Sequence, residues 1–352
     1  MSNKPQGAPD TKVDSTEVAA LVKNVTGVAA LSSYAQAYQK RLGVTIVADT
    51  GADFNPDVAK ALRIEVIPFR YVGPDGEHAD DMWQSISPHD FYEYMRKHPD
   101  ERFRTQAVTP GAYMEIFKGL YERWHRPIIY LGLTGGLSSS IDAARQGVEL
   151  VKEDYPEAEI YVVDNLCPSA AAELLVIETV RQAALGLTAK ELVAWAEDAR
   201  YFIQGYFTLD SLHWLAAGGR IPPAAAQVGG KLDVKPELSY DVNGSLSLKG
   251  MCRGRRKALR AILKDFENNY AHDPSLPMVI MDADAPKDAE WLEKKIREMD
   301  GCADITVVRS SISPVIGSHV GPGMVAAAFW GTDRREKLSL TDRIARRVRA
   351  KE

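Results

Sequence analysis

Small polar loops rich in hydroxyl groups and glycine recur along the chain, each after a short apolar run. They are ADTGAD with Asp49, Thr50 and Asp53, RTQAVTPG with Thr105, Gln106 and Thr109, GLTGGLSSS with Thr134, Gly136, Ser138 and Ser140, and VDN with Asp164 and Asn165. Hydroxyl groups and glycine N–H groups suit an anionic oxygen ligand, especially where a helix begins immediately afterwards. Helix capping is the simpler explanation of each loop taken alone. Their accumulation favours an anion-binding site.

A candidate cation, Arg220, lies in a predicted joint between two helices. Leu209, Leu212 and Leu215 have the spacing of one helix face, Gly218-Gly219 end that helix, and Pro222-Pro223 begin another. Arg220 either caps the carbonyl groups of the preceding helix or binds a ligand. His213 faces away from the leucines, which predicts a structural or solvated side chain.

A last candidate is His319, which stands among the glycines of VIGSHVGPG, residues 315–323. Taken alone this stretch is predicted to be a turn, because glycines permit positive φ and close approach of the backbone. Beside Arg220 and the hydroxyl loops, His319 becomes a candidate donor at the rim of a carboxylate site.

Common catalytic and nucleotide-binding signatures do not occur. The chain has no G-x-x-x-x-G-K-[ST], no G-x-G-x-x-G after a strand, no G-x-S-x-G and no H-E-x-x-H. The histidines stand apart from one another and from the cysteines, so sequence-local metal spacing is missing and no metal is expected. Cys167, Cys252 and Cys302 form no C-x-x-C pair, which favours a reducing cytoplasm.

The composition is that of a globular protein. The 352 residues are 45% hydrophobic and 26% charged, with a formal net charge of −5. This charge gives no reason to expect a nucleic-acid partner. The apolar stretch 18–31 is interrupted by Lys23 and Asn24 and is too short for a transmembrane helix. We therefore expect a cytoplasmic protein.

The elements that must position the polar loops alternate between strands and helices. The apolar run 44–50 predicts a buried strand, and seven helix-like or apolar segments follow in turn, namely 56–62, 64–72, 88–98, 111–124, 127–133, 140–153 and 159–165. This alternation predicts an α/β fold whose N-terminal domain has a mainly parallel sheet flanked by helices. Loops at the carboxyl ends of such strands converge on one crevice.

The second half predicts a different arrangement. Two consecutive helices are expected over about 169–185 and 188–200, followed by a hairpin at Asn243-Gly244, a basic helix from about Arg255, and strands at 277–283 and 304–311. We therefore predict a second α/β domain with a mixed sheet. The predicted division begins with an N-terminal extension (1–40), which is disordered and then helical from residue 17. An α/β domain with the carboxylate-binding loops (41–168), a second α/β domain (169–331) and a basic helical tail (332–352) follow.

The tail spaces Leu340, Ile344 and Val348 four residues apart among arginines. This spacing predicts a basic amphipathic helix. A solvated helix or one docked on the body is the simpler interpretation, and transient contact with a membrane surface is the alternative.

Taken together, these segments resemble the DegV family. The segment 208–259 is similar to the family's helix, its Gly-Gly-Arg-Ile joint, Lys-Pro strand, hairpin and basic helix, in the same order. IGSHVGPG resembles the family pattern Ile-Gly-x-His-x-Gly-Pro-Gly, and VADTGAD and LTGGLSSSIDAA resemble two upstream motifs. The resemblance spans residues 43–331. The loops at 105–109 and 134–138 each lack hydroxyl residues that the family pattern has.

The resemblance implies a fatty-acid-binding subunit of a bacterial fatty acid kinase. A long-chain fatty acid would lie between the two domains, and a separate ATP-binding kinase subunit would phosphorylate its carboxylate to an acyl phosphate. This chain would then need no cofactor, because ATP and Mg²⁺ belong to the kinase. The implied ligand-binding residues are Thr105, Thr134, Gly136, Ser138, Asp49 and Thr50, with Arg220 and His319 at the carboxylate and as candidates to assist phosphoryl transfer.

Two other functions remain open at this point. An autonomous α/β hydrolase could use Ser138 or Ser140 as the nucleophile with His319 as the base, although no elbow motif supports it. A lipid carrier or regulator that works without a kinase is the second alternative.

Overall fold

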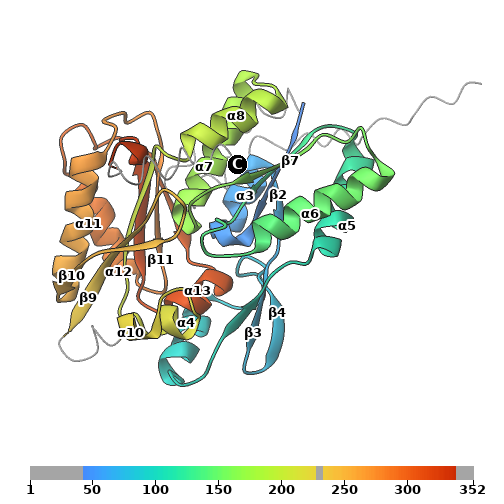
Figure 1. Ribbon diagram of the computed structural model, residues 1–352. Coiled ribbons are helices and arrows are strands. Elements are labelled where there is room, and N and C mark those ends of the chain that lie inside the picture. Colours follow the sequence, from blue (N-terminus) through green and yellow to red (C-terminus); the bar gives the residue numbers. More distant parts are fainter. Residues whose placement is uncertain (1–42, 227–232, 338–352) are drawn as a thin grey trace, which may run out of the picture.

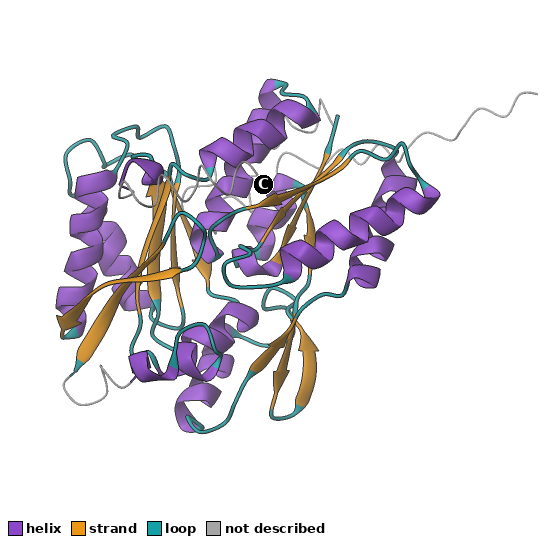
Figure 2. Ribbon diagram, viewed as in Figure 1, coloured by secondary structure: helices purple, strands orange, loops and turns teal. Residues whose placement is uncertain are grey.

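The computed structural model describes residues 43–226 and 233–337, which form three β-sheets and the helices that cover them (Figures 1 and 2). Two large sheets stand on opposite sides of the molecule, and a small third sheet lies below them in the view of Figure 1. The predicted α/β fold, with a parallel sheet in the first half and a mixed sheet in the second, is confirmed.

The first sheet is wholly parallel. Its strands lie in the order β2 (Glu65–Ile67), β1 (Thr45–Asp49), β6 (Ile128–Gly132) and β7 (Ile160–Asp164). Alternate residues of β1 point to opposite faces, so Val47 packs in the core with the helices α5 (Pro110–Trp124) and α6 (Ser140–Asp154). Ile46 and Ala48 face the other way, where α3 (Pro56–Leu62) lies.

The second sheet is mixed. Its strands lie in the order β10 (Leu246–Arg253), β9 (Val234–Tyr240), β8 (Ile203–Thr208), β13 (Val325–Trp330), β11 (Met278–Asp282) and β12 (Val307–Ser311). β11 and β12 are parallel, and every other pair is antiparallel. The helices α11 (Arg255–Asn269) and α12 (Pro286–Arg297) cover its outer face.

Two consecutive helices, α7 (Ser169–Leu185) and α8 (Ala189–Ala199), lie between the large sheets. Every residue of α7 from Ser169 to Val180 is buried, including the polar Glu173, Glu178 and Thr179. Residues of α7 share one hydrophobic cluster with inward-facing residues of both sheets. The boundary predicted between 168 and 169 thus falls at the start of a helix that packs against both halves.

The third sheet and one helix form a unit that we call the cap, residues 70–106. It contains β4 (Gly76–Ala79), β3 (Arg70–Gly73) and β5 (Arg104–Gln106) in an antiparallel sheet, with α4 (Pro88–Lys97) beside it. The Tyr92 hydroxyl donates to the Ile312 carbonyl oxygen at 2.6 Å, which joins the cap to the second half of the chain. The sequence pattern predicts α4 but not this sheet, whose strands are only three or four residues long.

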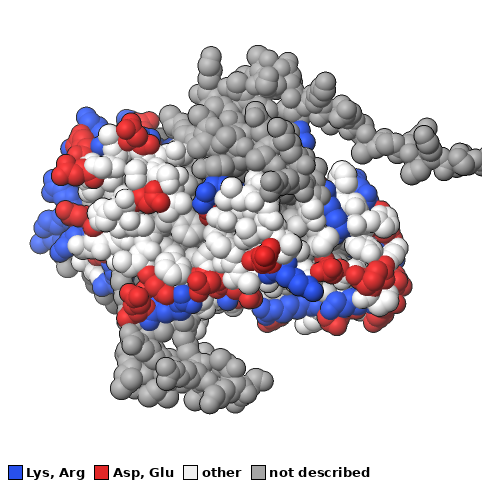
Figure 3. All heavy atoms as spheres, turned by 90° about the horizontal axis from the view of Figure 1, so that it is seen from above, with Lys and Arg blue, Asp and Glu red and all other residues white. Residues whose placement is uncertain are grey.

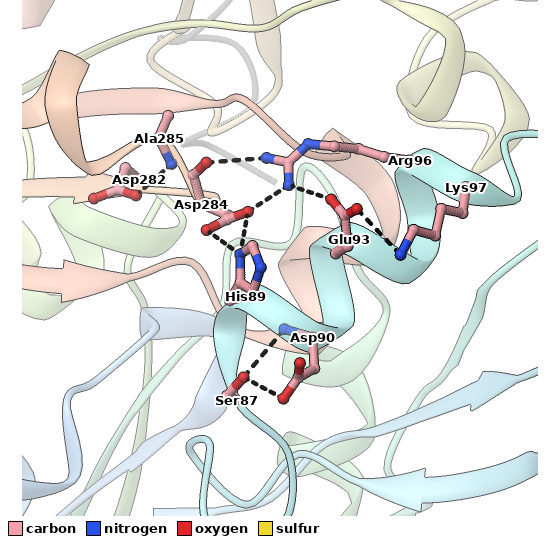
Figure 4. Close-up of polar contacts among 9 residues, drawn as sticks. All are labelled: Ser87, His89, Asp90, Glu93, Arg96, Lys97, Asp282, Asp284 and Ala285. Carbon is pink, nitrogen blue, oxygen red and sulfur yellow. Dashed lines mark hydrogen bonds and ion pairs between the residues drawn. The ribbon is translucent and has the colours of Figure 1, made fainter.

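The cap and the second half also meet in a cluster of charged side chains (Figure 4). Asp284 follows β11 in a left-handed conformation, with φ 55°. From α4, Arg96 binds both the carboxylate and the carbonyl oxygen of Asp284, and the His89 Nδ1 lies 3.2 Å from the same carboxylate. Figure 4 shows these side chains converging on Asp284, so we call the Arg96–Asp284 contact the cap clasp.

The hairpin predicted at Asn243-Gly244 is confirmed. It joins β9 to β10, Gly244 has φ 78°, and the Asp241 carboxylate accepts hydrogen bonds from the backbone N–H groups of Asn243 and Ser245. Positive φ is readily adopted by glycine, which explains the choice of residue.

The interpretation of VIGSHVGPG as a turn is wrong for residues 315–320 and holds only for its last residues, 322–323. Residues Pro314–Val320 form the helix α13, which begins after Ser313 and ends at Gly321 with φ 71°. Ser313 followed by Pro314 is a signal for the start of a helix, whereas Gly317 within the same stretch favours a turn. Gly317 is needed for packing, because a Cβ there would lie 2.5 Å from the Tyr92 hydroxyl oxygen.

The predicted joint around Arg220 is present, but its first helix is shorter than expected. The helix α9 spans only His213–Ala217, so Leu209 and Leu212 precede it, although both are buried. Gly218 ends α9, Gly219 has φ 73°, and α10 spans Pro223–Ala226.

Two short 3₁₀ helices complete the described elements, η1 (Thr50–Ala52) and η2 (Arg334–Lys337). The predicted N-terminal extension, 1–40, and residues 338–352 of the predicted basic tail lie outside the described residues. Among the residues that are described, no helix is both long and apolar enough to cross a membrane.

Candidate functional site

A cavity of about 250 Å³ lies between the two halves of the chain. The cap contributes Thr105 and Gln106 to its wall or rim, and Phe69 and Ala107 line it just outside the two ends of the cap. The residues that follow strand β6 contribute Leu133 and the loop 137–140. α7 supplies Ala170 and Ala171, and the second half supplies the remaining wall. Most of these side chains are apolar, which is typical of a site for a largely apolar small ligand.

Small residues of two neighbouring strands leave the space for the cavity. Gly205 of β8 pairs with Ala328 of β13, and Phe207 pairs with Ala326. Gly205, Ala326 and Ala328 line the cavity. Larger side chains at these three positions would project into the space between the second sheet and α7.

One end of the cavity carries the polar groups. The His319 Nε2 lies 2.9 Å from the Thr105 Oγ1, so α13 and β5 are joined at this point. Arg220 also lines the cavity, and its guanidinium donates to the Gly218 carbonyl oxygen at 2.6 Å. The interpretation of Arg220 as a cap of α9 is confirmed, and its place in the cavity lining leaves ligand binding as a prediction. We call Thr105, Arg220 and His319 the polar end.

Burial sets the charge of the polar end. It lowers the pKa of His319 to about 3, and the nearby Arg220 charge lowers it further in the same direction. Burial also lowers the pKa of Arg220, but a guanidinium remains protonated at neutral pH. The polar end therefore holds one positive charge, on Arg220, and a neutral imidazole.

Of the predicted site residues, Thr105, Ser138, Arg220 and His319 line the cavity, as does Ser140. Thr134, Gly136, Asp49 and Thr50 do not belong to its lining. The Thr134 Oγ1 donates to the Gly244 carbonyl oxygen at 3.2 Å, and a Cβ at Gly136 would collide with the Gly244 backbone. These two residues hold the β9–β10 hairpin against the first half of the chain.

Asp49 and Thr50 have structural partners, two of which belong to the cavity wall. The Asp49 carboxylate accepts hydrogen bonds from the Tyr130 hydroxyl at 2.6 Å and from the Leu133 backbone N–H at 2.8 Å. Burial raises its pKa to about 6. The Thr50 Oγ1 accepts from the Phe69 backbone N–H at 3.0 Å. Both side chains thus fix the ends of strands and the loop that enters the cap.

The serines of the 137–140 loop contact each other. The Ser138 and Ser140 hydroxyl oxygens lie 2.8 Å apart, and the Ser140 backbone N–H donates to Ser138. A nucleophile normally needs a hydrogen bond to its base. Within residues 43–226 and 233–337, His319 makes its side-chain hydrogen bond to Thr105 and not to either serine.

Sequence reasoning missed the apolar wall and a buried acidic cluster beside it. Asp53 accepts from the Ser169 hydroxyl at 2.5 Å and from the Ser313 backbone N–H at 2.9 Å, and burial raises its pKa to about 8. Nothing in the local sequence of ADTGAD indicates that these partners lie more than a hundred residues away. The run Ala326–Ala328 on a buried strand was a usable signal for the cavity.

The described residues hold no cluster of three or more His, Cys, Asp or Glu side chains that could bind a metal ion. Charges of both signs alternate along the edges of the face in Figure 3, around a broad uncharged area. Neither the absence of such a cluster from the described residues nor the surface charge points to a ligand other than the largely apolar small molecule that the cavity suggests.

Comparison with known proteins identifies the family. The family model described as "Uncharacterised protein, DegV family" matches residues 43–331. The chain belongs to the DegV family. A DegV domain-containing protein of Clostridium perfringens is 30% identical over 286 residues, which cover 81% of this chain and 97% of the relative. The predicted resemblance is therefore confirmed.

Solved DegV structures share the fold. DegV from Bacillus subtilis, described as a fatty acid binding protein, superposes with a TM-score of 0.69 at 21% identity and covers 82% of this chain and 99% of that chain. The Fatty Acid Kinase (Fak) B3 protein of Streptococcus pneumoniae, loaded with linoleic acid, has a TM-score of 0.71 at 21% identity, with coverage of 82% and 99%. At these identities the likeness establishes the DegV fold.

Proposed function

We propose that this DegV protein binds a long-chain fatty acid in the cavity and presents its carboxylate to a separate kinase subunit, which phosphorylates it to an acyl phosphate. The observation that carries the proposal is a buried apolar cavity with its only arginine, Arg220, and the Thr105–His319 pair at one end, among the described residues. The fatty acid bound by the S. pneumoniae relative supports the choice of ligand.

The tail supplies most of the affinity in this proposal. Burial of each methylene group contributes about 0.8 kcal/mol, so a chain of about 16 carbons gains on the order of 12 kcal/mol before ordering costs are subtracted. A hydrogen bond to a charged group contributes about 1.5–3 kcal/mol. The polar end therefore orients the ligand more than it holds it.

The charge of the polar end suits a carboxylate. Arg220 offers the compensating positive charge, and neutral His319 with Thr105 offers hydrogen-bond donors without a second charge. An incoming phosphoryl group is itself anionic, so Arg220 and His319 are also placed to assist its transfer. ATP and Mg²⁺ belong to the kinase in this scheme, and the chain acts as the substrate-binding subunit.

Analysis of bound lipid tests the ligand directly. The chain is purified under native conditions, extracted with organic solvent, and the extract is examined by mass spectrometry. We expect a stoichiometric long-chain fatty acid. Purified protein that neither carries such a lipid nor binds added octadecanoic acid would contradict the proposal.

Acyl phosphate formation with a kinase subunit tests the second step. Arg220→Ala and His319→Ala should lower the rate at least tenfold at saturating fatty acid, while the melting temperature stays close to that of the wild type. His213→Ala is a matched control, because His213 is exposed on the neighbouring helix α9. Equal rates in all variants would remove both residues from phosphoryl transfer. Fatty acid binding without acyl phosphate formation by any kinase subunit would favour a lipid carrier.

A further inference from the structure

Buried side-chain atoms without a hydrogen-bond partner are unusual, because leaving such an atom unsatisfied costs about 1–3 kcal/mol. Among the residues that line the cavity, two such atoms occur within the described part of the chain, the His319 Nδ1 and the Tyr240 hydroxyl oxygen. Tyr240 is 5% exposed. His319 belongs to the polar end, and Tyr240 does not.

The two atoms lie at different levels of the cavity. α13 and α9 both attach at the level where β8 ends at Thr208 and β13 begins at Val325, which pair with each other. In the antiparallel pairing of β8 with β9, Thr208 lies opposite Glu237 and Phe207 opposite Leu238. Continuing this register places Tyr240 opposite Gly205. Gly205 is three residues before Thr208, or about 10 Å along the strand at about 3.4 Å per residue.

The Tyr240 side chain is held firmly in this place. The Arg334 guanidinium lies over its ring, 4.6 Å from the ring centroid. On the other side, a Cβ at Gly205 would lie 2.3 Å from the hydroxyl oxygen, so the hydroxyl group rests directly on a glycine. The hydroxyl group therefore has a fixed position beside the small residues Gly205 and Ala328 that make the cavity.

The neighbouring residues on β8, β13 and β10 are apolar, whereas the Arg334 guanidinium and the Cys167 thiol also lie near Tyr240. Gly205, its β13 neighbour Ala328 and the β10 neighbour Leu246 offer no side-chain hydrogen-bonding group. A buried water molecule needs about two to four polar partners. A partner for Tyr240 is therefore better supplied by the ligand than by solvent.

We propose that the ligand is a long-chain fatty acid with an oxygen substituent, a hydroxyl or keto group, in the middle of its chain, and that the Tyr240 hydroxyl binds this oxygen. The inference rests on the proposed function, because the carboxylate is taken to lie at the polar end. A tyrosine hydroxyl group donates to either kind of oxygen and also accepts from a hydroxyl group. Tyr240 thus selects the substrate and takes no part in phosphoryl transfer.

The test compares the wild type with Tyr240→Phe in binding to octadecanoic acid, 10-hydroxyoctadecanoic acid and 2-hydroxyoctadecanoic acid, measured by calorimetric titration of delipidated protein. We expect the wild type to bind the 10-hydroxy acid more tightly than octadecanoic acid. In Tyr240→Phe the ratio of these two affinities should fall about three- to tenfold. Affinity for octadecanoic acid and for the 2-hydroxy acid, whose hydroxyl group lies beside the carboxylate, should change less than twofold.

The melting temperature of the ligand-free variant is a second readout. Phenylalanine keeps the ring between Arg334 and Gly205, so Tyr240→Phe should be as stable as the wild type or more stable. A lower melting temperature would reveal a protein partner for the hydroxyl group and overturn the inference.

The remaining outcomes are separable. An unchanged preference in Tyr240→Phe would overturn the role of Tyr240 while leaving fatty acid binding intact. If Tyr240→Phe lost as much affinity for cis-9-octadecenoic acid as for the 10-hydroxy acid, the Tyr240 hydroxyl group would be contacting a double bond of the acyl chain. This result would overturn the proposal that it binds an oxygen substituent. Failure of both proteins to bind any of the acids would instead contradict the proposed function.

Discussion

At the scale of single residues, the buried acids show how the fold sets charge. Asp53 has a pKa of about 8 because burial outweighs the hydrogen bonds from Ser169 and Ser313. The folded state therefore takes up a proton as pH falls below about 8, whereas an unfolded aspartate does so only near 3.8. Stability consequently rises as pH falls through this window, by at most about 1.4 kcal/mol per pH unit.

Asp53→Asn should remove this dependence. Between pH 8 and pH 6 the free energy of unfolding of the variant should change less steeply with pH than that of the wild type, because only the contributions of Glu173, Asp49 and Asp80, whose pKa values burial also raises, remain. At pH 9 the variant should be more stable than the wild type, since it no longer carries a buried charge at residue 53. Denaturant unfolding from pH 6 to 9 measures this, with Asp142→Asn, at an exposed site on α6, as the control. A slope equal to that of the wild type would contradict the assignment.

Thr105 and Thr109 belong to one predicted hydroxyl loop but have different roles. Thr109 caps α5, since its Oγ1 accepts from the Ala112 backbone N–H at 3.2 Å, whereas Thr105 contacts His319 in the cavity. Thr109→Val should lower the free energy of unfolding by about 1 kcal/mol without changing fatty acid affinity. Thr105→Val should weaken fatty acid binding severalfold and retain the stability of α5. Equal effects on binding would refute this division.

These two threonines also show what the sequence could predict about the site. Residue types and local patterns, together with the resemblance to the DegV family, selected Thr105, Ser138, Arg220 and His319, which do line the cavity. The same criteria selected Thr134, which binds the Gly244 carbonyl oxygen instead. Local sequence cannot distinguish these cases, because the partner of each hydroxyl group comes from a distant segment.

At the scale of elements, the cap clasp joins α4 to the loop after β11 (Figure 4). The cap carries Thr105 and part of the cavity wall, so its separation would open the cavity. Arg96 is 36% exposed, which limits the contribution of the clasp to about 1 kcal/mol. The clasp is therefore strong enough to affect the rate of opening but too weak to determine the fold.

Arg96→Met should speed fatty acid dissociation about fivefold, with a much smaller change in melting temperature. Stopped-flow transfer of a fluorescent fatty acid to lipid vesicles measures the rate. Lys97→Met is the matched control, because Lys97 pairs with Glu93 on the same helix. Equal dissociation rates in the wild type and in Arg96→Met would show that the ligand leaves by another route.

Elements with a clear period were predicted well, and short ones were not. The hairpin followed from Asn243-Gly244, and the helices α5, α6 and α7 followed from their apolar spacing. The cap sheet was missed because strands of three or four residues carry too little alternation. α13 was missed because Gly317 resembles a turn residue, whereas it is required by the packing of Tyr92.

At the scale of the whole molecule, α7 and Arg334 connect the two halves. α7 packs against both large sheets, and the Arg334 guanidinium donates to carbonyl oxygens of Leu166, Arg200 and Asp241. The largest of the three hydrophobic clusters contains residues of both halves, so we expect the chain to unfold in a single cooperative transition. The two halves are therefore separate in topology but not in stability.

Arg334→Met should lower the free energy of unfolding by at least about 3 kcal/mol, because it leaves several buried carbonyl groups unsatisfied. The transition should remain single and should be seen equally by fluorescence and circular dichroism. Arg335→Met, which removes partly exposed ion pairs, should cost about 1 kcal/mol or less. Two separate transitions in either protein would contradict the shared core.

The position of the cavity inside this shared core has a consequence for the lifetime of the protein. A bound acyl chain would contact α7 and both halves of the molecule, so it would act as a removable part of the core. Each tenfold rise in free fatty acid above the Kd would then add about 1.4 kcal/mol to the stability of the folded chain. The abundance of the protein in a cell that degrades unfolded chains would consequently follow the supply of its own ligand.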